Sequence, residues 1–398
     1  MTLLFEKYKT LFKTFLSEQW IYGSRILYLS IIFTFSLIAY YNLNKGFVMS
    51  SDSVWYSEAA DEIIKLKFKL YSYYIQNTHT IPNFFYTLPI LLIATLKLLF
   101  GAGWQYAFMI FNLILVLFLI LLFAKILLLL KVRPLLISIS ILFLTTSVDL
   151  LTWPRYILTD VIFSFLVMSI ICIATKKIVK DQNGNFLLIS LMILLFLTRP
   201  TSIAFIIAIT LFFLSLKIKA NFNPKLILLI ILSIFIFTPI IMAISFKLMS
   251  VNMNNNTQIF FIVEMVRSGM IIHDRPETWI ETPHNIFEVI NLYFTRQYYF
   301  FSPYIKSFSK IHIGLNLFQT FIFLFSIFIW FLLGKKFILI NKLIFLILLI
   351  SMLVTGFHSF TLIDYDFRYR FPLIVPLMMI FPLAIEIFLK KIVYKNFK

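Results

Sequence analysis

The stretch from residue 105 to 124, QYAFMIFNLILVLFLILLFA, holds twenty residues and no charged side chain. A helix of that length spans the ~30 Å hydrocarbon core of a bilayer. Comparable apolar runs recur along the whole 398-residue chain, of which 61% is hydrophobic and only 13% charged. This composition excludes a disordered chain, a nucleic-acid-binding module and a cytosolic multi-domain enzyme. The sequence therefore predicts an all-α, polytopic membrane protein with a single transmembrane domain over residues 1–398.

Clusters of lysine and arginine orient the predicted helices, because basic loops face the cytoplasm. All the clusters between the apolar runs share one side with the N-terminus if ten runs cross and the apolar segment 84–100 does not. The predicted crossings are 26–43, 105–124, 135–151, 157–175, 186–198, 201–216, 226–245, 313–333, 337–358 and 371–389. One alternative stays open, since a single kinked crossing over 186–216 would invert every later loop.

The ten-crossing topology accounts for the net charge of +18 as an orientation signal. It predicts a multi-pass protein of the plasma membrane, the inner membrane of a bacterium, with both termini in the cytoplasm and nearly every carboxylate outside. The outer segments are a first outer loop at 44–103 with amphipathic helices, a large outer loop at 246–312 and a short one at 359–370. The single cysteine, Cys172, excludes a disulfide framework.

Four carboxylate and arginine side chains stand at the outer ends of the first few crossings. Asp52 follows the first one, while Asp149, Arg155 and Asp160 flank a turn broken by Pro154. Ionisable groups at a membrane boundary are costly, so they usually line a watery cavity or meet a partner. Asp52 and Asp160 at equal depth could share a divalent cation, Mg²⁺ or Mn²⁺, or a basic group of the substrate. The structural alternative for both is capping of the helix that each precedes.

Three further arginines face the same outer side. Arg199 lies at the tip of the hairpin formed by the two short crossings 186–198 and 201–216, where snorkelling to lipid headgroups would explain it without any function. If the loop is extended, the spacing of two places Arg368 and Arg370 on one side of it. In a helix they would take neighbouring positions that are less favourable for joint binding. Two guanidinium groups there would bind a phosphate. The alternative is a solvated turn in which they pair with Asp364 and Asp366.

These residues belong to an ordered set of short motifs. The set comprises Asp52 with Tyr56, Pro82…Leu88-Pro89…Leu99-Phe100-Gly101, Arg155…Leu158-Thr159-Asp160, Leu197-Thr198-Arg199-Pro200, and Arg368-Tyr369…Pro372…Pro376. In order and spacing it resembles the GT-C superfamily of membrane glycosyltransferases. The nearest kin are the protein O-mannosyltransferases and the bacterial enzymes that transfer aminoarabinose to lipid A. The chain departs from the mannosyltransferase pattern in having Ser53 after Asp52, and it lacks the WWDxD-type motif of oligosaccharyltransferases.

The resemblance implies a GT-C-like fold and an enzyme that takes a sugar from a polyprenyl-phosphate donor at the outer face, usually with inversion. The acceptor would be a periplasmic or extracellular glycan, lipid or protein. The implied roles are catalytic carboxylate for Asp52, metal or acceptor binding for Asp160 or Asp149, donor phosphate binding for Arg370, Arg368, Arg155 and Arg199, and substrate lining for Tyr56 and Tyr369. A metal, if used, would lie at Asp52 and Asp160.

Other functions compete with the transferase. A flippase of lipid-linked glycans needs ionisable groups along a path through the midplane, and here they gather at one face. An O-antigen or polysaccharide polymerase would also work at one face, and only the ordered Asp52…Asp160…Arg368 set argues against it. A non-catalytic scaffold would tolerate loss of Asp52. The five histidines lack metal-ligand spacing, and nothing in the sequence favours a nucleic-acid partner.

Overall fold

The structure, a computed structural model, describes residues 2–76, 82–180, 185–218, 222–251, 268–273, 275–304, 306, 308–363 and 368–396. Side chains are described for the same residues except 2–22, 76, 82–83, 241–251, 276 and 392–396. Within these ranges every regular element is a helix, and extended backbone pairs only as two isolated bridges. The predicted all-α class is confirmed.

Six helical stretches are long and apolar enough to cross a membrane, which indicates a membrane-embedded protein. They are Gly23–Lys45, Thr87–Leu129, Asp160–Lys180, Lys310–Lys336, Ile338–Thr361 and Arg368–Lys391. A seventh arises if Pro134–Leu144 and Val148–Arg155, bent by 71°, count as one. The predicted count of ten is not confirmed, because Asn185–Phe196 and Ser202–Lys217 are apolar but short, and Pro224–Ile240, the apolar part of a helix that continues to Val251, is not among the six. The segment 84–100, predicted not to cross, contains the whole apolar helix Thr87–Phe100 that opens the second stretch.

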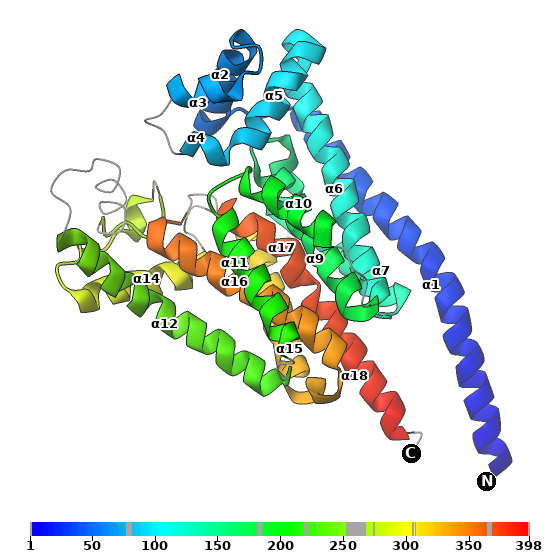
Figure 1. Ribbon diagram of the computed structural model, residues 1–398. Coiled ribbons are helices and arrows are strands. Elements are labelled where there is room, and N and C mark those ends of the chain that lie inside the picture. Colours follow the sequence, from blue (N-terminus) through cyan, green and yellow to red (C-terminus); the bar gives the residue numbers. More distant parts are fainter. Residues whose placement is uncertain are drawn as a thin grey trace.

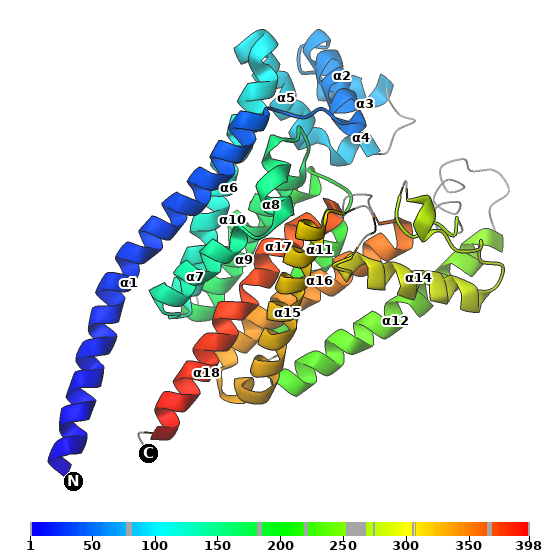
Figure 2. The same ribbon diagram turned by 180° about the vertical axis from the view of Figure 1, so that it is seen from behind.

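The two ends of the molecule differ in character (Figures 1 and 2). Helix α1 (Thr2–Lys45) runs the length of the molecule, and both chain termini lie at one end. The opposite end carries the helices of the segment 44–103. These are α2 (Ser51–Lys65), α3 (Leu70–Gln76), α4 (Pro82–Phe85) and α5 (Thr87–Phe100). The predicted first outer loop is thus a helical cap at the end away from the termini.

The remaining helices form the bundle beneath this cap. They are α6 (Trp104–Leu129), α7 (Pro134–Leu144), α8 (Val148–Thr152), α9 (Asp160–Lys180), α10 (Asn185–Phe196), α11 (Ser202–Lys217), α12 (Pro224–Val251), α14 (Ile286–Phe301), α15 (Lys310–Leu333), α16 (Ile338–Thr361), α17 (Phe371–Met378) and α18 (Ile380–Asn396), with short 3₁₀ turns η1 (Gly101–Gly103), η2 (Trp153–Arg155), η3 (Pro276–Thr278), η4 (Gly334–Lys336) and η5 (Arg368–Arg370). Helix α1 packs on α7, α6 on α9, α15 on α18, and both α11 and α12 on α16.

A small residue sets the spacing between α12 and α16. A Cβ atom added to Gly356 would lie 2.7 Å from the Cγ2 atom of Thr238, closer than side chains pack. Lipid tails are as apolar as the side chains, so the hydrophobic effect does not drive membrane helices together. Small residues instead let the helix backbones approach closely and gain van der Waals contacts. Helix α16 is accordingly the most buried of the candidate spans.

Backbone pairing joins the segments that precede the charged residues. The Val48 N–H donates to the Arg155 carbonyl at 2.9 Å, and the Ile157 N–H donates to the Val48 carbonyl at 3.1 Å. The turn at residues 151–156 is held further by two buried amides. Asn42 on α1 donates to the Leu151 carbonyl at 2.8 Å, and Asn112 on α6 donates to the Tyr156 carbonyl at 3.1 Å. The starts of α2 and α9 are therefore fixed near each other.

A second bridge ties the described part of the large outer loop to the segment before η5. The His273 N–H donates to the Ile363 carbonyl at 2.9 Å. Arg296 on α14, fully buried, donates through Nη2 to the Met270 carbonyl at 2.6 Å and through Nη1 to the Ser359 carbonyl at 3.3 Å. The described residues 268–273 and helix α14 thus pack onto the end of α16 that carries Ser359.

Candidate functional site

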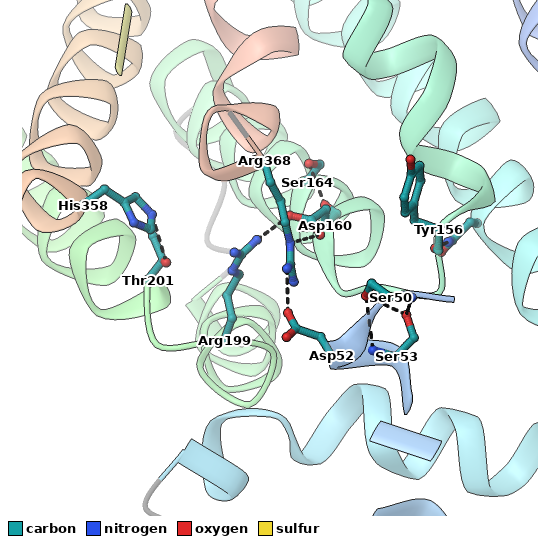
Figure 3. Close-up of polar contacts among 11 residues, drawn as sticks. Ser50, Asp52, Ser53, Tyr156, Asp160, Ser164, Arg199, Thr201, His358 and Arg368 are labelled. Carbon is teal, nitrogen blue, oxygen red and sulfur yellow. Dashed lines mark hydrogen bonds and ion pairs between the residues drawn. The ribbon is translucent and has the colours of Figure 1, made fainter. Parts of the chain in front are cut away.

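Asp52 lies in the first turn of α2, but it does not cap the helix. Ser50 is the N-cap, and its hydroxyl accepts from the Ser53 N–H at 3.3 Å while the Ser53 hydroxyl accepts from the Ser50 N–H at 3.0 Å. The two serines thus form a reciprocal capping box. The capping interpretation of Asp52 is therefore wrong. The Asp52 carboxylate points away from the start of the helix, toward Arg368 (Figure 3).

Asp160 is the first residue of α9, and both of its carboxylate oxygens accept from arginine. Oδ1 accepts from Nη1 of Arg199 at 2.6 Å, and Oδ2 accepts from Nε of Arg368 at 2.9 Å. The side chain is only 2% exposed. Asp160 is therefore an ion-pair partner of two arginines. Its carboxylate oxygens bind guanidinium groups and not the backbone N–H groups that a helix cap would bind.

Arg368 connects the two carboxylates. Its Nη1 donates to Oδ2 of Asp52 at 2.6 Å while its Nε holds Asp160, so one guanidinium lies between them (Figure 3). Arg199, in the link between α10 and α11, is buried on the other side of Asp160, which rules out snorkelling to headgroups. The structure thus brings together Asp52, Asp160, Arg199 and Arg368, a set we call the Asp–Arg cluster, from four distant parts of the chain.

The cluster is formally neutral, with two carboxylates and two guanidinium groups. Burial of such charges is tolerated because each is paired and hydrogen-bonded, and removal of one partner leaves a costly unpaired charge. Exposure is uneven within it. The side chains of Arg199, Asp160 and Arg368 are 3%, 2% and 11% exposed, whereas that of Asp52 is 45% exposed. The cluster is thus a buried ion pair network with one carboxylate at its solvent side.

Aromatic rings pack against the guanidinium of Arg199. The Arg199 guanidinium lies 5.3 Å from the ring of Tyr369 and 5.6 Å from that of Phe163, both within cation–π range. The Tyr369 ring stacks on His358 of α16 at 3.9 Å, and Nε2 of His358 lies 3.2 Å from the Thr201 hydroxyl. Tyr369, predicted to line the substrate, therefore lies between His358 and Arg199.

Tyr56 lies one helical turn after Asp52 and is almost fully buried. Its ring packs against Tyr86 with 5.3 Å between centroids. Burial first, and then Tyr86, raise the pKa of Tyr56 well above its ordinary value, although nearby Arg368 acts in the opposite direction. Tyr56 is therefore a neutral phenol at physiological pH. Its ring and that of Tyr86 form an aromatic surface beside the cluster.

Arg370 separates from Arg368 and belongs to a different environment. Because η5 is a 3₁₀ turn rather than an extended loop, the two side chains diverge. Nη2 of Arg370 lies 3.4 Å from Oδ2 of Asp149, and Nη1 donates to the Ser302 carbonyl at 3.3 Å. The alternative pairing with Asp364 and Asp366 falls on residues outside those that the structure describes.

Arg370 and Asp149 form the polar lining of a cavity of about 450 Å³ between α7, α12, α15, α16 and α17. Its other polar lining residues include Asn316 and Gln319, and Gln319 donates to the Thr146 hydroxyl at 3.2 Å. Most of the remaining wall is apolar, with residues such as Ile231 and Phe323. We call this cavity the lipid-side groove, since Leu232 and Leu324 on its wall are also exposed on the outside of the bundle.

Arg155 does not join either group through the contacts that the structure describes. Its guanidinium lies 5.7 Å from the Tyr156 ring, and its buried Nε finds no hydrogen-bond acceptor among the described residues. Its carbonyl, by contrast, takes part in the bridge to Val48. The contribution of Arg155 that the structure describes is therefore through its backbone.

A divalent cation does not fit between Asp52 and Asp160 as they are placed. Both oxygens of Asp160 are taken by guanidinium nitrogens, and the Arg368 guanidinium occupies the space between the two carboxylates. Among the side chains that the structure describes, no three His, Cys, Asp or Glu residues come together as a metal site would require. We therefore derive no step through a metal.

His358 and Phe163 are neighbours of the cluster that the sequence argument did not select. No metal-ligand spacing points to His358, but an ionisable residue inside an apolar run is itself a signal of a functional site. Phe163 carried no signal, because it is one of 48 phenylalanines.

In comparisons with known proteins, no family model, no curated protein and no solved structure matches this chain.

Proposed function

We propose that the protein is a membrane glycosyltransferase of the GT-C type, which moves a sugar from a polyprenyl-phosphate carrier to an acceptor at the outer face of the membrane. One observation carries the proposal. Asp52, Asp160, Arg199 and Arg368, which stand far apart in the sequence motifs, converge on one cluster of carboxylates and guanidinium groups (Figure 3). The cluster lies next to the helical cap, at the end of the molecule away from the termini.

The reaction needs a base at the acceptor and positive charge at the leaving group. Asp52 is the exposed carboxylate of the cluster and is the proposed base. It takes the proton of an acceptor hydroxyl while that oxygen bonds to the anomeric carbon. The bond from this carbon to the phosphate oxygen breaks, and its electron pair leaves with the polyprenyl phosphate. Inversion follows because the acceptor attacks opposite the leaving group.

The arginines provide the positive charge. Arg368 lies beside Asp52, and Arg199 is fixed behind it by Asp160 and the Tyr369 ring. Arg370 stands at the polar wall of the lipid-side groove. A long apolar chain suits the rest of that groove, so a donor with a phosphate head and an isoprenoid tail matches the chemistry of both regions. In this proposal Asp160 positions the two guanidinium groups and does not act on the substrate.

The proposal is tested by transfer of labelled sugar from a panel of polyprenyl-phosphate sugars, with the purified protein in lipid bilayers. We expect turnover with at least one donor, and a raised KM for that donor in Arg370→Ala. A matched control is Arg275→Ala, on the outer loop away from the groove lining. Absence of turnover with every donor and a range of glycan, lipid and peptide acceptors would contradict the transferase, and flipping or polymerisation of lipid-linked glycan would then be assayed.

A further inference from the structure

Arg368 divides its guanidinium between two carboxylates that differ in how firmly they are held. Asp160 binds Nε at 2.9 Å, is buried, and is gripped from its far side by Arg199 at 2.6 Å. Asp52 binds Nη1 at 2.6 Å from the solvent side, through one oxygen, and its side chain is 45% exposed. An incoming anion would therefore displace Asp52 and not Asp160, since an exposed carboxylate regains its hydration when it leaves.

From this asymmetry we infer that the Nη1 edge of Arg368 is an anion site for the phosphate of a lipid, at which Asp52 and the phosphate exclude each other. The inference rests on the proposed function and deepens it. Guanidinium binds phosphate oxygens through directed, charge-assisted hydrogen bonds of the kind that it gives to a carboxylate. Arrival of the phosphate at Arg368 releases the Asp52 carboxylate.

The exchange links donor binding to the base. While Asp52 is paired with Arg368, the guanidinium occupies its Oδ2 atom, so that oxygen is not available to an acceptor hydroxyl. Once released, it lies beside the bound phosphate and can accept the proton of an acceptor hydroxyl. The Asp52 carboxylate and the phosphate compete for Arg368, and such coupling is reciprocal. Removal of the Asp52 charge must therefore strengthen phosphate binding by the amount that Asp52 weakens it in the wild type. This predicts the opposite sign from a residue that helps to hold the donor.

The test measures equilibrium binding of farnesyl phosphate to the full-length protein in nanodiscs, by isothermal titration. We compare the wild type with Asp52→Asn and with Asp61→Asn. Asp61 is a matched control, because it lies on the same helix, is 52% exposed and pairs with Lys97 at 2.7 Å, on another face of the cap. Farnesol, which has the same chain and no phosphate, reports the contribution of the isoprenoid.

We expect Asp52→Asn to bind farnesyl phosphate about fivefold more tightly than the wild type, the size expected for loss of a competing ion pair that is partly exposed. Asp61→Asn should match the wild type, and farnesol should bind all three alike. Arg368→Lys, which keeps the charge near Asp160 but loses the planar fork, should bind farnesyl phosphate more weakly. Equal or weaker binding of farnesyl phosphate by Asp52→Asn would overturn the exchange.

Binding and turnover fail separately in this design. If Asp52→Asn binds farnesyl phosphate more tightly but the wild type transfers no sugar, the exchange is supported and the transferase is contradicted. Loss of turnover in Asp52→Asn with unchanged binding of farnesyl phosphate would do the reverse. Thermal unfolding of each variant confirms that the binding compared is that of folded protein.

Discussion

At the scale of single residues, Asp52 and Asp160 have the same chemistry and opposite situations. Both lie in the first turn of a helix, so residue type and position do not rank them, and only the resemblance assigned the catalytic role to Asp52. The structure separates them by burial, since Asp160 is enclosed by two guanidinium groups and Asp52 faces solvent. A catalytic base must be reached by substrate, while a buried ion-pair partner must not move. The two carboxylates are therefore expected to respond differently to the same substitution.

Substitution of Asp160 by Asn should destabilise the folded protein by about 3–5 kcal/mol, the usual effect of breaking a buried ion pair and leaving charge unpaired. The same change at Asp52 should reduce stability by less than about 1 kcal/mol, because the side chain is half exposed. Unfolding in mixed micelles measures both. Equal losses at the two positions would show that the difference in burial has no energetic meaning.

Removal of divalent cations should leave sugar transfer unchanged, because guanidinium groups occupy the oxygens that a metal would need. The measurement is turnover after dialysis against EDTA, compared with turnover after addition of Mg²⁺ or Mn²⁺. Loss of activity that either ion restores would mean that Arg368 moves out of the space between Asp52 and Asp160 during catalysis.

At the scale of helices, sequence periodicity predicted the elements well and their partners poorly. Each of the ten expected crossings contains a helix, because long apolar runs leave the backbone no other way to satisfy its hydrogen bonds in lipid. Spacing could not show that Arg368 and Arg370 would diverge, since that depends on the 3₁₀ turn between α16 and α17. Nor could it show the Val48–Tyr156 bridge, which joins residues that no local pattern connects.

The lipid-side groove gives a prediction at this scale. Ile231 on α12 lines the groove, whereas its neighbour Ile230 is 38% exposed on the outside of the bundle. Replacement of Ile231 by Trp should fill part of the groove and raise the KM for a long polyprenyl-phosphate sugar about tenfold, with less effect on a short farnesyl donor.

The control for the groove is Ile230→Trp, which adds the same ring on the outer side of the same helix. We expect its kinetics to match the wild type with donors of both lengths. If the two tryptophan variants behave alike, or if short and long donors suffer equally from Ile231→Trp, the groove does not hold the isoprenoid chain.

At the scale of the whole molecule, the termini and the helical cap lie at opposite ends (Figures 1 and 2). Basic clusters predict that the end with the termini faces the cytoplasm. The number of crossings remains a prediction, because α10 and α11 are shorter than a bilayer needs if upright. Because both termini lie at one end of the molecule, we expect an even number of crossings.

Cysteine labelling in cells tests this orientation. In a Cys172→Ser background, Lys65→Cys on α2 should react with a membrane-impermeant maleimide from outside, because the residue is exposed in the cap. Lys335→Cys, exposed on η4, should react only after the membrane is permeabilised. The reverse pattern would place the Asp–Arg cluster on the cytoplasmic side, where a polyprenyl-phosphate sugar at the outer face could not reach it.

We propose Asp52 as the base of sugar transfer from a polyprenyl-phosphate donor, and turnover of Asp52→Asn beside Asp61→Asn measures that role. Both variants lose one negative charge from α2 and one ion pair. We predict that kcat falls at least about 100-fold in Asp52→Asn, as for loss of a general base, and stays at the wild-type value in Asp61→Asn. Wild-type kcat in folded Asp52→Asn would contradict the account.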